Sequence, residues 1–266
     1  MASRMEQKQQ ARAARRAAAE VAVAAASRRR RMRTFGAIIA IAVTAVVVTV
    51  MVSSGRATPS GPLSKAQAAR AYRSVEHVLT GIPQHGERLG RADAKVTMTY
   101  VGDLECPYCR YFTLHVLPQF LSADVRTGKV KVVYRSLCTA TCHFNTRRFV
   151  PQQVAAYAAG RQNLFWQYAE LFYREQEDET LPYVTEHYLR NLARQIPSLN
   201  VTRWLSERSD PALGSQVQDD QREINRLRVP EQTPEVLMSG PRGTTYLPAQ
   251  GAPTLAWLSQ AVAEVS

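Results

Sequence analysis

Two cysteines separated by two residues, Cys106 and Cys109, are the residues of this 266-residue chain whose type and spacing most directly indicate chemistry. Thiols at this spacing can form and open a small disulfide, which is redox chemistry. Three other interpretations stay open. The first is a zinc site, which normally needs four ligands. The second is a structural disulfide, although so short a loop constrains the unfolded chain little. The third is chance spacing.

The elements around the motif place Cys106 at the start of a helix. Residues 96–101 are β-branched and aromatic, which predicts a strand that ends just before the motif. After the motif, apolar residues at spacings of three and four predict a helix, with Leu114, Leu117 and Leu121 on one face. A helix N-terminus stabilises a thiolate. We therefore expect Cys106 to be the exposed, low-pKa thiol and Cys109 the buried, resolving thiol.

Three neighbours are expected to modify this pair. Pro107 and Tyr108 lie between the two sulfurs in the first turn of the predicted helix, and they are the candidates for tuning the redox pair. Glu105 directly precedes Cys106, and we expect its negative charge to oppose formation of the thiolate.

A second cysteine pair, Cys138 and Cys142, follows another predicted strand at residues 128–135. A strand-helix-strand connection of this length implies parallel strands, whose carboxyl ends meet at one edge of the sheet. Residues four apart in a helix have Cα atoms about 6 Å apart, which is within disulfide range. We interpret the pair as a structural disulfide. An auxiliary redox pair and a metal site that includes His143 remain alternatives.

The N-terminal residues predict a membrane anchor. The first 33 residues carry ten Lys and Arg against two Glu, which accounts for eight of the twelve net positive charges. Residues 35–52 carry no charge and would span roughly 27 Å as a helix, close to the hydrocarbon thickness of a bilayer. Because Lys and Arg concentrate on the cytoplasmic side, we expect a basic cytoplasmic tail at 1–34 and an extracytoplasmic remainder.

Two alternatives to this anchor are disfavoured. A cleaved signal peptide would have a shorter basic region and a shorter apolar stretch. Nucleic-acid binding by the arginines is not expected, because a position next to a membrane span explains them as determinants of topology or as lipid contacts.

The remaining residues suit one folded domain. We place a linker with a short helix at 53–80, and the domain itself at 81–266. A helical section at about 151–229 separates the first two strands from later elements, which are a strand at 235–238, its hairpin partner at 244–247 and a closing helix at 254–265.

These residues resemble the DsbA-type thioredoxin-fold oxidoreductases. The resemblance rests on residues 102–109 after the first strand, on residues 132–135 in the second and on Thr233-Pro234 before the third, and it covers roughly residues 85–266. It implies an α/β thioredoxin fold with a helical insertion, preceded here by the transmembrane helix. It also implies a cis bond before Pro234, beside the redox pair, that leaves the Thr233 backbone free to pair with an extended substrate.

One position departs from this family. Many members have a buried carboxylate six residues before the first cysteine that assists proton transfer, and here that position is Tyr100. The relay is therefore in question, with Asp103 and Glu105 as candidate substitutes.

The sequence thus predicts a membrane-tethered thiol:disulfide oxidoreductase that introduces disulfides into exported proteins and uses neither cofactor nor metal. The resemblance implies two partners, namely reduced exported substrates and a membrane-embedded protein that reoxidises the cysteine pair. A reductase or isomerase with the same fold, and a non-enzymatic sensor or interaction module, are the competing hypotheses.

Overall fold

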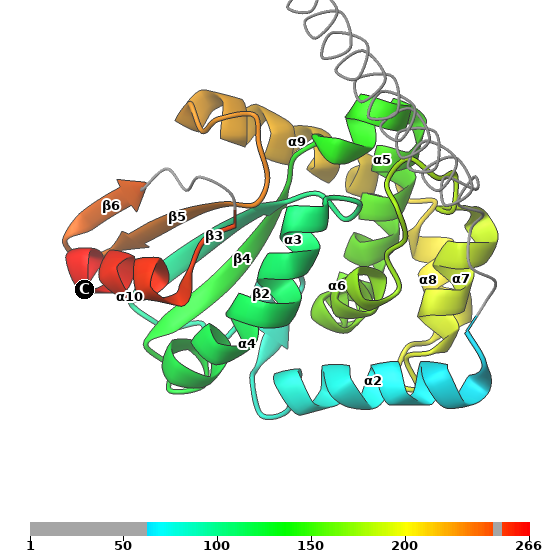
Figure 1. The fold of residues 1–266 in the computed structure, drawn as a ribbon, viewed down its shortest axis with the longest axis horizontal. Coiled ribbons are helices and arrows are strands. Elements are labelled where there is room, and N and C mark those ends of the chain that lie inside the picture. The colour runs from blue at the N-terminus through cyan, green and yellow to red at the C-terminus, as the bar shows by residue number, and fades with distance from the viewer. Residues whose placement is uncertain (1–62, 247–251) are drawn as a thin grey trace, which may run out of the picture. The chain divides into compact units, whose positions relative to one another are not determined.

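A computed structural model of the protein describes residues 63–246 and 252–266. Its centre is a mixed sheet of order β1-β2-β4-β3-β5-β6 (Figure 1). The strands are β1 (Gln84–His85), β2 (Arg88–Leu89), β3 (Val96–Gly102), β4 (Val130–Ser136), β5 (Glu235–Gly240) and β6 (Gly243–Tyr246). All four strands expected from the sequence are present. The hairpin β1–β2 was not predicted, because strands of two residues carry no periodicity.

The pairing of the strands brings three distant parts of the chain to one edge of the sheet. Strand β3 runs parallel to β4, with Gly102 opposite Ser136 at their carboxyl ends. Strand β5 runs antiparallel to β3, with Glu235 opposite Val101. The segments after β3, after β4 and before β5 therefore meet at this edge, which is where ligands and chemistry collect in open α/β sheets.

The helix after Cys106 is divided into four segments. They are α3 (Pro107–Tyr111), the π-helical η1 (Phe112–Val116), α4 (Leu117–Phe120) and the π-helical η2 (Leu121–Val125). Pro118 has no N–H to donate to the carbonyl four residues earlier, which explains the change of hydrogen bonding before α4. Leu117 and Leu121 are buried as expected, whereas Leu114 is half-buried.

The helical section between β4 and β5 contains α5 (Ala140–Gly160), α6 (Phe165–Arg174), α7 (Glu186–Arg194), α8 (Val201–Glu207) and α9 (Pro211–Leu227). Helix α5 begins at Ala140, well before residue 151, where the insertion was predicted to start. Asn145 has non-helical backbone angles, so a kink divides α5 there, and Pro151 lies within the helical part after the kink.

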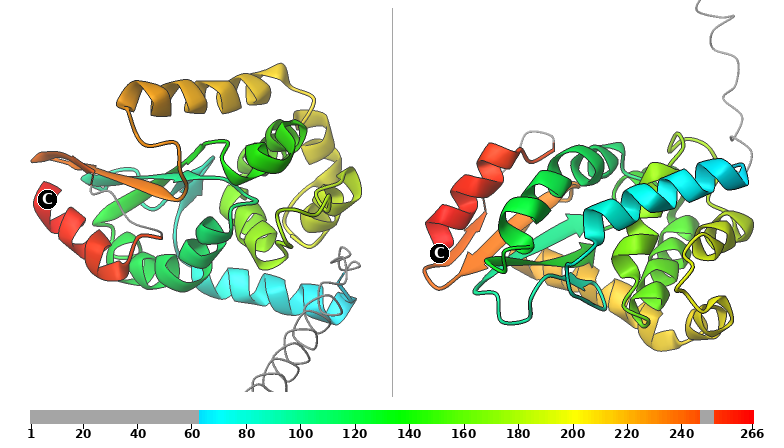
Figure 2. Two further views of the ribbon diagram at one scale, coloured as in Figure 1. Left: turned by 45° about the horizontal axis from the view of Figure 1, so that its top comes forward. Right: turned by 90° about the horizontal axis from the view of Figure 1, so that it is seen from below.

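Helices cover both faces of the sheet (Figure 2). Helix α9 lies on one face, while α10 (Leu255–Val265) and the segments after Cys106 lie on the other. Helix α2 (Lys65–Leu79) packs on α6 and contributes Val75 and Leu79 to the main core. The core therefore extends N-terminally past Gly81, where the sequence analysis placed the start of the domain.

No helix within residues 63–246 and 252–266 has the length and apolar character needed to cross a bilayer. The predicted tail at 1–34, the predicted transmembrane helix at 35–52 and residues 53–62 of the predicted linker lie outside the described residues.

Candidate active site

Cys106 is the N-cap residue of α3, and its sulfur is held from two sides. The Cys109 N–H donates a hydrogen bond to Cys106 Sγ at 3.4 Å, so an orphan donor of the helix N-terminus points at this sulfur. From the other side, the Cys106 thiol donates to the carbonyl oxygen of Thr233 at 3.2 Å. The sulfur thus lies between the helix and the segment that precedes β5.

The two free thiols have opposite pKa shifts. Hydrogen bonding from the Cys109 thiol lowers the pKa of Cys106, with burial opposing this effect and the Cys109 N–H supporting it. Burial raises the pKa of Cys109 well above its usual value, and the neighbouring Cys106 adds to the rise. The expected order of the two pKa values is therefore present. The expected exposure of Cys106 is wrong, because only 3% of the residue is exposed in this reduced form.

The segment before β5 supplies the wall opposite the helix. The peptide bond between Thr233 and Pro234 is cis, as the resemblance implied. Thr233 is buried, its carbonyl faces Cys106, and its hydroxyl lies 2.6 Å from Thr139 Oγ1. The predicted cis-proline pair and the predicted cysteine pair are thus brought together.

The surroundings of the cysteines include exposed tyrosines on α3 and a buried glutamine that binds the turn before α3. Pro107 occupies the first turn of α3, while Tyr108 and Tyr111 are 61% and 55% exposed. The buried Gln176 donates hydrogen bonds to the carbonyl oxygens of Leu104 (2.7 Å) and Cys106 (3.2 Å). These two hydrogen bonds were not predicted, because Gln176 comes from the loop after α6 and carries no sequence signal.

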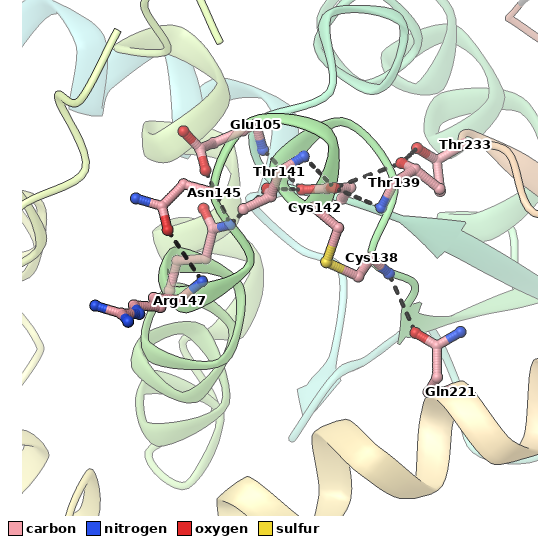
Figure 3. The surroundings of a disulfide bond; sticks show 11 residues. Glu105, Cys138, Thr139, Thr141, Cys142, Asn145, Arg147, Gln221 and Thr233 are labelled. Atoms are coloured by element: carbon pink, nitrogen blue, oxygen red, sulfur yellow. Dashed lines mark hydrogen bonds between the residues drawn. A yellow bond between two sulfur atoms is a disulfide. The ribbon is translucent and has the colours of Figure 1, made fainter. Parts of the chain in front are cut away.

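The second cysteine pair forms a disulfide, Cys138–Cys142, with Cα atoms 5.5 Å apart (Figure 3). Both thiols are used in this bond, so the alternative of a metal site with His143 loses its two sulfur ligands. The pairing predicted from the sequence is confirmed. The bond closes a short loop at the same edge of the sheet as Cys106.

The disulfide loop encloses a set of donors that converge on Asp103, which is completely buried. Thr139 and Thr141 each donate both a backbone N–H and a hydroxyl to the Asp103 carboxylate. The Glu105 N–H supplies a fifth hydrogen bond. Burial raises the pKa of Asp103, and these hydrogen bonds oppose the rise. The sequence named Asp103 as a candidate but gave no sign of these five hydrogen bonds, which we call the Asp103 cradle. Their donors converge only when the loop is folded.

Glu105 is paired rather than directed at the active thiol. It lies 3.3 Å from an Arg148 guanidinium nitrogen and accepts a hydrogen bond from Gln152. Burial raises the pKa of Glu105 to about 7, and Arg148 opposes this rise. The predicted repulsion of the Cys106 thiolate by Glu105 is replaced by one from Asp103, whose charge raises the pKa of Cys106.

Tyr100 places a neutral hydroxyl at the position of the family carboxylate. Its hydroxyl lies 3.5 Å from the Cys109 carbonyl oxygen, 3.1 Å from Thr113 Oγ1 and 3.4 Å from the Tyr173 hydroxyl. Burial raises the pKa of Tyr100 well above its usual value, so the phenol stays protonated. The space beneath Cys109 is therefore lined by uncharged hydroxyls.

Thiol–disulfide exchange is the chemistry that this edge of the sheet supports, and the surrounding architecture is the thioredoxin fold with a helical insertion. The protein is accordingly a thiol:disulfide oxidoreductase with a DsbA-like fold. The family model described as thioredoxin matches residues 84–245, and the chain belongs to this family.

Known proteins similar to this chain agree with that class. The probable disulfide bond formation protein D of Bacillus anthracis is 25% identical over 161 residues, which cover 58% of this chain and 70% of the relative. Among solved structures, oxidised BdbD from Bacillus subtilis has a TM-score of 0.56 at 18% identity and covers 69% of this chain and 96% of its own. Wolbachia pipientis alpha-DsbA1 has a TM-score of 0.54 at 16% identity, covering 67% and 89%. At these identities the structures support the fold alone.

Proposed function

We propose that the protein is a membrane-tethered oxidant that introduces disulfides into exported proteins through Cys106 and Cys109. The observation that carries this proposal is the asymmetry of the two thiols. A hydrogen-bonded Cys106 with a lowered pKa favours its thiolate, and a stabilised thiolate favours the reduced form over the disulfide. A cysteine pair whose dithiol form is the more stable one readily transfers its disulfide to the thiols of another protein. The relatives named for disulfide bond formation support the same direction.

The reaction consists of two exchanges. A client thiolate attacks Cys106 Sγ of the Cys106–Cys109 disulfide, the bond between the two protein sulfurs breaks, and Cys109 leaves and takes up a proton. The client's second thiolate then attacks the client sulfur that is bonded to Cys106, the bond between that sulfur and Cys106 Sγ breaks, and Cys106 is released as the thiolate. The client loses two electrons and two protons and gains a disulfide, while the protein becomes a dithiol. The raised pKa of Cys109 favours protonation of this leaving group.

Two segments are assigned to client binding and tuning. The Thr233–Pro234 segment faces Cys106, and its backbone would pair with an extended client. Pro107 and the exposed Tyr108 would adjust the helix N-terminus and contact the client. A membrane-embedded protein would then reoxidise the dithiol, as the resemblance implies, and no cofactor is required for either exchange. In this proposal Cys138–Cys142 is structural.

The direction of electron flow can be tested with the full chain in its disulfide form. We expect it to oxidise a reduced, unfolded client with two cysteines, followed as loss of free thiols, and we expect Cys106→Ser to be inactive. If the dithiol form instead reduces a protein disulfide much faster than the disulfide form oxidises the client, the reductase or isomerase hypothesis replaces this one. If neither reaction exceeds that of Cys106→Ser, the sensor hypothesis is favoured.

The membrane anchor is a separate part of the proposal. Residues 35–52 would form a retained single-pass helix, residues 1–34 would stay in the cytoplasm, and residues 53–80 would connect the helix to the extracytoplasmic domain at 81–266. The tether predicts that the chain stays in the membrane fraction after an alkaline carbonate wash. It also predicts that protease added outside the cytoplasmic membrane digests the domain. Recovery in the soluble fraction would indicate cleavage of the apolar segment.

A further inference from the structure

A cavity of about 1040 Å³ lies between α2, α7 and the loop that joins α6 to α7. Its volume is at the upper end of the range of small-molecule sites, which is about 300–1,000 Å³. Figure 1 shows α2 and α7 on the side of the domain away from β6. The described residues that line the cavity include neither Cys106 nor Cys109, although the buried Gln176 lies in its wall and donates to the Cys106 carbonyl oxygen at 3.2 Å. The cavity is therefore distinct from the redox pair and adjoins its backbone.

The interior of the cavity is mostly apolar and partly aromatic. Tyr183 is buried, and its ring lies edge-to-face against the ring of Tyr188 at 5.1 Å. The hydroxyls of Tyr188 and Tyr72 already donate hydrogen bonds, to the Phe172 carbonyl oxygen and to Glu76. These two rings therefore add apolar surface to a wall that also contains Leu63, Ala68, Ala69, Pro182 and Pro197. Burying an apolar group here removes apolar surface from water on both sides.

Cationic side chains predominate among the charged groups of the wall. The Lys, Arg and Glu residues that line the cavity are Lys65, Arg73, Arg174, Arg194, Glu175 and Glu177. Arg174 is paired with Glu170 at 3.1 Å, whereas Lys65, Arg73 and Arg194 are exposed. Long basic side chains can cover apolar surface with their stems while their charges stay in water. The wall thus combines an apolar interior with exposed positive charge.

We propose that this cavity binds an amphipathic anion, whose acyl chain fills the apolar interior and whose acidic group lies among Lys65, Arg73 and Arg194. A cationic amphiphile of the same length meets like charges, and an uncharged one forms no ion pair, so the site selects for negative charge. Free fatty acids and acidic membrane lipids share this chemistry. The inference goes beyond thiol exchange, and its test involves no redox step. It therefore stands or falls separately from the proposed function.

The test labels the site directly. The full chain is placed in nanodiscs of phosphatidylcholine and irradiated with decanoate that carries a diazirine, and the labelled peptides are identified by mass spectrometry. We expect adducts in peptides from residues 65–73 of α2 and from α7. Unlabelled decanoate should displace this label at several-fold lower concentration than decanol or decyltrimethylammonium. Equal displacement by the three, or labelling spread evenly over the chain, would overturn the inference.

Two substitutions on α2 form a matched pair that tests the cavity itself. Ala69 is exposed and lies in the wall, whereas Ala66 is exposed on the same helix and is not a lining residue. Ala69→Trp should fill the cavity and abolish the specific adducts, and Ala66→Trp should leave them unchanged. If Ala69→Trp does not fold, His187→Trp fills the cavity from an exposed position on α7 and is measured in its place. Labelling that survives the cavity-filling change would contradict the assignment.

The charge requirement and the source of the ligand are tested with the same label. Arg73→Gln should weaken displacement by decanoate roughly two- to five-fold, as expected for one exposed ion pair, without affecting decanol. Arg226→Gln, at an exposed arginine of α9 outside the wall, is its control and should have no effect. Equal effects of the two arginine changes would argue against an acidic group at this site. Phosphatidylglycerol added to the nanodiscs identifies a membrane lipid as the occupant if it blocks labelling, and a free amphiphile if it does not; both results support the site.

Discussion

Cys106 and Cys109 are three residues apart, and their surroundings give them different tasks. Cys106 receives an N–H from α3 and faces Thr233, whereas Cys109 is fully buried and its carbonyl oxygen lies 3.5 Å from the Tyr100 hydroxyl. In the proposed reaction a client thiolate attacks Cys106, and Cys109 is the leaving group that can attack again and reverse the exchange.

This division of tasks predicts different mixed disulfides in two single variants. Cys109→Ala should accumulate covalent adducts with client proteins, because the thiol that would resolve them is absent. Cys106→Ala should accumulate few or none, because its remaining thiol, Cys109, is fully buried and has a raised pKa. Non-reducing gel electrophoresis of trapped complexes measures both. Adducts that form mainly in Cys106→Ala would reverse the assignment of the two thiols.

At the scale of single elements, the loop between β4 and α5 joins stability to the geometry of the site. The Cys138–Cys142 disulfide holds Thr139 and Thr141 where their N–H groups reach Asp103. A loop of this size contributes about 1–2 kcal/mol through the entropy of the unfolded chain. Its contribution to the fold is therefore modest.

Replacing both Cys138 and Cys142 by Ala should lower the free energy of unfolding by about this amount, while much of the exchange activity remains. Urea unfolding and client oxidation, measured on the same preparation, provide the comparison. An unchanged free energy of unfolding together with abolished turnover would instead identify the pair as a second redox couple.

Helix α6 contains a carboxylate whose ionisation opposes folding. Glu170 is completely buried and lies 3.1 Å from an Arg174 nitrogen, and burial raises its pKa from 4.5 to about 7. The Glu170 carboxyl group thus binds its proton more tightly in the folded protein than in the unfolded chain. The stability that protonated Glu170 contributes is fully present below about pH 4.5 and is lost as the pH rises through about 7.

Glu170→Gln cannot ionise and should lack this part of the pH dependence. Between pH 5 and pH 8, the unfolding free energy of the parent chain should fall relative to that of the variant by on the order of 2 kcal/mol. Urea titrations at several pH values measure the difference. Glu105 has a shift in the same direction and remains in both proteins, so it cancels in the comparison. Parallel pH profiles would show that Glu170 is ionised in the fold across this range.

Several elements and site residues could be predicted from the sequence because their signals are local. The residues of β3 and β4 are β-branched and aromatic, and the spacing of Cys106 and Cys109 is itself a motif. Pro234 was assigned through the family resemblance. The Asp103 cradle could not be predicted, because its donors are backbone groups of Thr139 and Thr141 that converge only in the folded loop. The burial of Cys106 likewise depends on distant contacts.

For the molecule as a whole, the redox state of Cys106 and Cys109 is coupled to the stability of the fold. If the site favours the Cys106 thiolate, the dithiol form of the protein is the more stable one, by thermodynamic linkage. With Cys138 and Cys142 replaced so that one couple is tested, the reduced chain should unfold at a higher guanidinium concentration than the oxidised chain. A clearly more stable oxidised form would instead favour a reductase.

Strand β3 lies between β4, which follows it closely in the chain, and β5, which is made much later. A chain that emerges residue by residue presents both reactive cysteines before Thr233 and β5 exist. Until then one edge of β3 is unpaired, and no carbonyl faces Cys106. We therefore expect a half-made copy to behave as an unfolded polypeptide with several free thiols. A newly synthesised molecule would then be among the first clients of a finished one.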